Sequence, residues 1–139
     1  MNEVVSAGWE ALARGAWSDA LGLLEDAGDD PEALEGAGLA HWWLDNADAT
    51  VDARERAYRL YRERGDALGA ARVAGELAWD SVLFGSRLVV ARGWLDRAAR
   101  LLAETDPAPE HAWLAVREAE VALAAGEPAA AKDLSLIHI

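Results

Sequence analysis

Apolar residues recur at helical spacing along most of the chain. Near its beginning, Trp17, Ala20, Leu24 and Ala27 follow one another at three- and four-residue steps, which places them on one face of a helix. Gly15 precedes this helix and can adopt the positive φ that ends an earlier one. The pattern predicts a helical hairpin, in which the small Ala20 allows close approach and the larger side chains fill the remaining space.

The same pattern begins three more times. Pro31 is suited to the first position of the next helix, where its missing amide hydrogen costs nothing. Leu88, Ala91, Leu95 and Ala98 later repeat the spacing of the first hairpin. The helices predicted after the first hairpin span residues 31–44, 49–64, 66–84, 88–104 and 109–125, and a last one begins at Pro128 after a break at Gly126.

The sequence does not decide which side of the helix over residues 49–64 is buried. The apolar stripe of this helix consists of Ala53, Ala57 and Leu60 or of Val51, Tyr58 and Tyr61.

Residues 54–64 of the same helix form the most basic stretch of the chain, which raises the question of nucleic-acid binding. Glu55 and Glu63 each lie four residues from Arg59, so that opposite charges offset one another along the helix. We expect a solvated outer helix rather than a nucleic-acid site.

Four hairpin beginnings in one short chain predict an all-α repeat fold. Each hairpin would bury its apolar face only against its neighbours. We therefore expect a right-handed α-solenoid of antiparallel hairpins, with about 3.5 repeats in one domain over residues 1–131.

The first hairpin resembles tetratricopeptide repeats. The residues that match the motif are Gly8, Gly15, Trp17, Ala20, Leu24, Ala27 and Pro31. Several longer segments resemble the N-terminal repeat region of large bacterial transcription regulators that carry a LuxR-type helix-turn-helix at their C-terminus. Among these segments are GWEALARG, ARERAYRLYRERGD and HAWLAVREAEVALAAGE. This resemblance covers residues 8–131 and implies a fragment whose DNA-binding part is absent.

The end of the chain also suggests a fragment. A solenoid normally closes with a polar capping helix, whereas this sequence ends in the apolar and β-prone SLIHI. We interpret residues 132–139 as a non-native or disordered tail from a truncated reading frame and exclude them from functional inference. The alternative is a short native tail that packs on the last hairpin.

Charge and composition limit the possible partners. The chain has 25 acidic and 13 basic residues, a formal charge of -12, and no cysteine. Its average surface would repel nucleic acid and anionic lipid, and thiolate chemistry is excluded.

The N-terminal segment lacks the features of a signal peptide, and no apolar run is long enough to span a bilayer. We expect a cytoplasmic protein.

No residue pattern indicates catalysis, a cofactor or a metal. None of His41, His111 and His138 has a second ligand at metal-binding spacing. The acidic residues around Pro31 are better placed to cap the helix that begins there than to bind a cation. Phosphate-binding loops, nucleophile elbows and dinucleotide fingerprints are absent from the sequence, so we expect no enzymatic activity.

The tryptophans are the strongest candidates for a binding surface. Five of the seven lie on the first helix of a hairpin, which lines the concave face of tetratricopeptide solenoids. Aromatic and arginine side chains often anchor interfaces, although large rings at this spacing more commonly fill the core. The predicted partner-binding residues are Trp9, Leu39, Trp42, Arg72, Glu76, Trp79, Trp113, Arg117 and Glu120.

These patterns favour a protein- or peptide-binding sensing module of a LuxR-type regulator. A free-standing scaffold and the repeat region of a signalling enzyme such as a nucleotide cyclase remain alternatives. If the last repeat is incomplete, the apolar side of the helix that contains Trp113, including Leu114 and Leu123, would be partly uncovered, and the chain could self-associate there.

Overall fold

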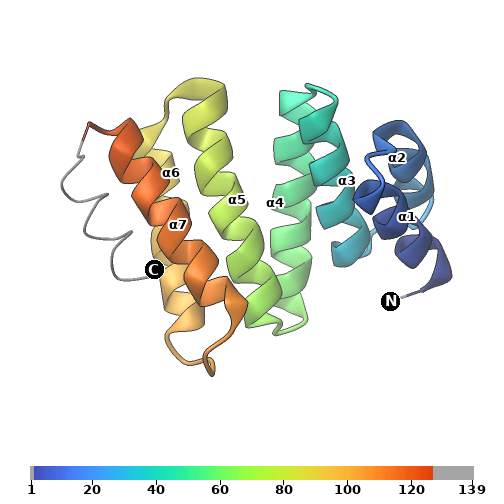
Figure 1. Ribbon diagram of the computed structural model, residues 1–139. Helices are drawn as coiled ribbons and strands as arrows, with labels where there is room; N and C mark the ends of the chain where they lie inside the picture. The colour runs from blue at the N-terminus through green and yellow to red at the C-terminus, as the bar shows by residue number, and fades with distance from the viewer. Residues whose placement is uncertain (1, 127–139) are drawn as a thin grey trace. The chain divides into compact units, whose positions relative to one another are not determined.

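Helices joined by turns and short loops make up the part that the computed structural model describes, residues 2–126 (Figure 1). That range contains no strand, which confirms the all-α prediction. The chain divides into two compact units, Met1–Arg64 (unit 1) and Gly65–Ile139 (unit 2). The helices are α1 (Glu3–Ala13), α2 (Trp17–Glu25), α3 (Pro31–Trp43) and α4 (Ala47–Glu63) in unit 1, and α5 (Ala67–Gly85), α6 (Leu88–Leu102) and α7 (Pro109–Ala124) in unit 2.

The turns between helices lie where the sequence predicted them. Gly15 separates α1 from α2 and has a φ of 75°, a left-handed conformation that glycine adopts without steric cost. Two other turns contain residues with a side chain in that region, Asp45 (φ 61°) and Ser86 (φ 51°). At the second of these the left-handed residue is therefore Ser86, not the preceding Gly85.

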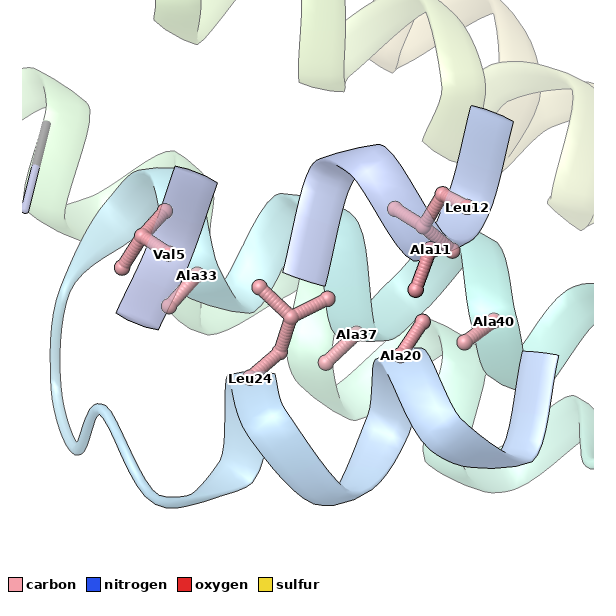
Figure 2. Packing of buried hydrophobic residues seen from close by; sticks show 8 residues of the cluster. All are labelled: Val5, Ala11, Leu12, Ala20, Leu24, Ala33, Ala37 and Ala40. Carbon is pink, nitrogen blue, oxygen red and sulfur yellow. The ribbon is translucent and has the colours of Figure 1, made fainter. Parts of the chain in front are cut away.

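Unit 1 is built around a leucine held between two glycines. Leu24 of α2 is 1% exposed and points into a cluster of small side chains that includes Ala37 (Figure 2). A Cβ atom added to Gly8 of α1 would lie 2.5 Å from Leu24 Cγ, and one added to Gly36 of α3 would lie 2.8 Å from Leu24 Cδ1. The two glycines thus make room for Leu24, and this allows α1, α2 and α3 to pack closely.

The start of α3 is capped as expected. Asp30 Oδ1 accepts hydrogen bonds from the amides of Glu32 at 2.8 Å and Ala33 at 3.2 Å. These bonds satisfy amides that have no partner within the helix. The interpretation of this acidic segment as a cap is therefore confirmed at Asp30, whereas the neighbouring Asp29 forms an ion pair with Arg56.

The buried side of α4 includes residues from both of the apolar stripes that the sequence allowed. Ala53 and Ala57 of one are buried, together with Tyr58 and Tyr61 of the other. Tyr61 also donates a hydrogen bond to Glu35 Oε1 of α3 at 2.6 Å.

The basic stretch of α4 is not simply a solvated face, which corrects the prediction. Arg54 is only 4% exposed. Its aliphatic stem packs on Gly38, where an added Cβ would lie 2.9 Å from Arg54 Cγ. Arg56 forms ion pairs with Asp29 and Asp52, and Arg64 forms one with Asp30.

In unit 2, α5, α6 and α7 contact one another around a small apolar core. Its buried members are Ala78, Ala91, Leu95 and Val121, and Leu114 packs against them. Trp113 and Leu123 are 60% and 59% exposed. Of the two side chains expected to be uncovered on α7, Leu123 is exposed, whereas Leu114 is half-buried against the core. Self-association through them stays a prediction.

Several predictions are not tested by the described part of the chain. The last helix at Pro128, the tail over residues 132–139 and the end of the domain at residue 131 lie beyond the described residues. The right-handed solenoid stays a prediction. Between residues 2 and 126, every helix is too short or too polar to cross a membrane.

Candidate protein-interaction site

Ion pairs join α5 to α7 in unit 2. Arg117 of α7 donates from Nη2 to Glu76 Oε1 of α5 at 2.8 Å, and from Nη1 to Glu120 Oε2 on its own helix at 2.8 Å. Arg72 of α5 donates from Nη1 to Glu110 Oε2 of α7 at 2.9 Å. Two arginines, one on each helix, therefore hold α5 and α7 side by side.

Arg117 and Glu110 are the most enclosed of these charges, each with 16% of its side chain exposed. Arg117 is held by two carboxylates. Burial lowers the pKa of its guanidinium, but the carboxylates of Glu76 and Glu120 outweigh this effect and hold the pKa above its ordinary value. The group stays charged throughout the physiological pH range. Its Nε atom is buried and makes no hydrogen bond within the described residues.

These charges belong to two rows of residues, one on each helix, that we call the α5–α7 strip. Its residues follow one another at three- and four-residue steps on each helix, so that each row lies on one side of its helix. The strip consists of Arg72, Glu76 and Trp79 on α5, and of Glu110, Trp113, Arg117 and Glu120 on α7.

The aromatic residues of the strip are unequally covered. Trp79 is half-buried, whereas Trp113 is 60% exposed although it lies between Glu110 and Arg117, which are both fixed to α5. An exposed indole beside an immobilised guanidinium has the composition of an interface anchor.

All six partner-binding residues predicted in unit 2 lie in this strip. Glu110, in the first turn of α7, was not among the predicted residues. Its pairing with Arg72 joins residues 38 positions apart, and no local pattern indicates it.

The three predicted residues of unit 1 have different surroundings. Trp9 Nε1 donates to the Glu32 carbonyl oxygen at 3.1 Å, and Trp9 and Leu39 pack against the unit 1 core. Trp42 meets Trp43 edge to face, with ring centroids 5.1 Å apart. Trp43 also stacks on Trp17 at 5.0 Å and is 52% exposed, so these rings form a second aromatic surface that spacing alone did not identify.

The two described histidines make hydrogen bonds that fit structural roles. His111 Nδ1 accepts from the Ala108 amide at 3.1 Å, and its Nε2 lies 3.2 Å from the Leu102 carbonyl oxygen. His41 Nδ1 lies 3.4 Å from Asn46 Nδ2. Residues 2–126 contain no cluster of three or more His, Asp or Glu side chains that could hold a metal ion.

Removing the charge of Arg117 should loosen α7. In Arg117→Met the stem is retained, but Glu76 and Glu120 lose their shared cation. We expect the free energy of opening of α7 amides, measured by hydrogen exchange, to fall by about 1–2 kcal/mol, between the values for exposed and buried pairs. Arg100→Met, at an exposed position of α6, is the control and should cost less than about 0.5 kcal/mol. Equal effects of the two substitutions would show that the ion pairs do not fasten α7.

Comparison of the chain with protein-family models, curated proteins and solved structures finds no match.

Proposed function

We propose that this chain is a protein-interaction module that binds a peptide segment of a partner on the α5–α7 strip. The observation that carries the proposal is the exposure of Trp113 beside Arg117, which two carboxylates hold in place. Tryptophan and arginine are the residues that most often dominate binding energy at interfaces, and a fixed side chain loses little conformational freedom on binding.

The strip carries both signs of charge. It has two cations, Arg72 and Arg117, and three carboxylates, and these groups are partly exposed. A peptide with an apolar side chain over Trp113 and polar groups on either side would find complementary donors and acceptors along the two helices. We propose that the module performs no catalysis and acts only by binding.

The proposal extends to the protein that contains the module. The helical hairpins would form a tetratricopeptide-like solenoid, and the chain would be the N-terminal sensing region of a cytoplasmic, bacterial LuxR-type transcription regulator. The repeat segments and the agreement between predicted and observed helices support this assignment. Sequencing the intact gene tests it. A helix-turn-helix coding region downstream of residue 131 would support the assignment, and an in-frame stop codon without one would refute it.

Peptide selection tests the binding surface. A random peptide library is selected against the purified chain, and the affinity of an enriched peptide is measured by fluorescence polarisation. Trp113→Ala should weaken binding by about 30-fold or more, as expected for an anchor worth about 2 kcal/mol. Val89→Ala is the matched control, because Val89 is 84% exposed on α6 and lies outside the strip. Unchanged affinity in Trp113→Ala, or failure to enrich any peptide, would contradict the proposal.

A further inference from the structure

Unit 1 contains a cleft that the proposed function does not use. It has a volume of about 300 Å³ and lies among α2, α3, α4 and the turn that follows α2. None of its lining residues belongs to the predicted interaction surface. The lining consists of Leu24, Glu25, Gly28, Asp29, Leu34, Ala37, His41, Ala49, Asp52, Ala53 and Arg56.

Part of the lining is aliphatic. Leu24, Leu34, Ala37 and Ala53 are buried, and Ala49 is half-buried. Alanines at three of these positions leave room for a narrow hydrocarbon chain, which could replace water against this surface.

The charged part of the lining is dominated by carboxylates. Glu25, Asp29 and Asp52 come from three different segments, and Arg56 is the single cation that accompanies them. Arg56 forms an ion pair with Asp29, and its Nη1 lies 3.7 Å from Asp52 Oδ2. Side-chain exposure of 73% at Asp29 and 71% at Asp52 makes these weak pairs that another cation can displace.

Glu25 adds a third acceptor. Its Oε1 lies 3.6 Å from His41 Nε2, and 59% of its side chain is exposed. The amide nitrogen Nδ2 of Asn46 faces His41 Nδ1, so we assign the proton of the neutral ring to Nε2, which faces Glu25. With neutral His41, three carboxylates and one guanidinium leave the cleft with a formal charge of -2.

We propose that this cleft binds an alkyl cation, an ammonium or guanidinium group on a short hydrocarbon stem. The stem would lie on the alanine and leucine side chains, and the cationic head would pair with one or two of the carboxylates at the rim, those of Glu25, Asp29 and Asp52. Lysine and arginine side chains of a partner protein have this chemistry, as do free alkylamines. An anion of the same length would meet the carboxylates unfavourably, and an alcohol would gain only the apolar contact.

NMR titration of the ¹⁵N,¹³C-labelled chain tests the proposal. n-Butylammonium should produce saturable shifts at the methyl groups of Ala37, Ala49 and Ala53, whereas butyrate and n-butanol at equal concentrations should not. Glu25→Gln and Asp52→Asn should each weaken binding about two- to fivefold, and added salt should weaken it further. Asp48→Asn, one turn earlier on α4 and outside the lining, is the matched control and should bind like the parent chain.

A second substitution tests the aliphatic contact independently of charge. Ala49→Leu should fill the cleft and abolish the saturable shifts, while the circular dichroism spectrum shows that the helices remain.

Titration with an acetylated and amidated Ala-Lys-Ala peptide separates the two sources of the cation. Comparable shifts with the peptide indicate a partner side chain, and shifts with the free amine alone indicate a small molecule. Equal responses to butylammonium and butanol, or full binding in both charge variants, would overturn the proposal.

Discussion

Leu24→Ala should lower the free energy of opening of the first three helices by about 3 kcal/mol. Leu24 is 1% exposed, and its side chain fills the space between Gly8 and Gly36. Because neither glycine has a side chain that could move into the vacated space, the substitution should leave a cavity. The loss combines the transfer free energy of the removed carbons with the cost of that cavity, and leucine-to-alanine changes in cores typically cost about 2–5 kcal/mol.

Hydrogen exchange of the amides in α1, α2 and α3 measures this loss within unit 1. Leu23→Ala provides the control, since Leu23 lies on the same helix but is only half-buried. It should cost about 1 kcal/mol, in proportion to the smaller apolar area removed from contact. If the two leucines cost the same, Leu24 is not the centre of the packing.

Gly8→Ala should destabilise unit 1 by about 2 kcal/mol, although alanine is the better helix former. The new Cβ would lie 2.5 Å from both Cγ and Cδ2 of Leu24, closer than carbon atoms can approach. Leu24 is enclosed by the core and cannot move away freely, so the helices must separate, and overpacking of this kind typically costs about 1–3 kcal/mol.

Two comparisons distinguish this clash from a general effect of the substitution. Gly22→Ala, on α2, places its Cβ in open space and should stabilise the helix by about 0.5–1 kcal/mol. In the Leu24→Ala background, Gly8→Ala should lose most of its cost, because the group that it strikes has been removed. Additive effects of the two substitutions, or equal effects at Gly8 and Gly22, would contradict the packing described for Leu24.

The sequence predicted the helices well because their signals are local. Helical spacing, the glycines at turns and the proline at the start of α3 all act within a few residues of one another. The buried side of α4 could not be predicted from such local signals. Its buried stripe includes Arg54, and this residue is buried because Gly38, on another helix, leaves room for its stem.

The predicted site rests on local signals only in part. Spacing placed Trp113, Arg117 and Glu120 on one side of α7, and the structure joins Arg117 to Glu76, 41 residues earlier. The pairing of Glu110 with Arg72 depends on how α5 and α7 pack, which no local pattern encodes. The cleft of unit 1 is assembled from three helices and a turn, and its acidic residues each resemble ordinary surface positions in the sequence.

The central functional claim, that a peptide binds on the α5–α7 strip, can be tested with the tryptophans themselves. Each of the seven indole N–H groups gives one signal in a ¹⁵N spectrum of the chain. Addition of a selected peptide should shift the signals of Trp79 and Trp113. The signal of Trp9, whose indole donates to the Glu32 carbonyl, should stay in place. Unchanged Trp79 and Trp113 signals at saturating peptide would contradict the account.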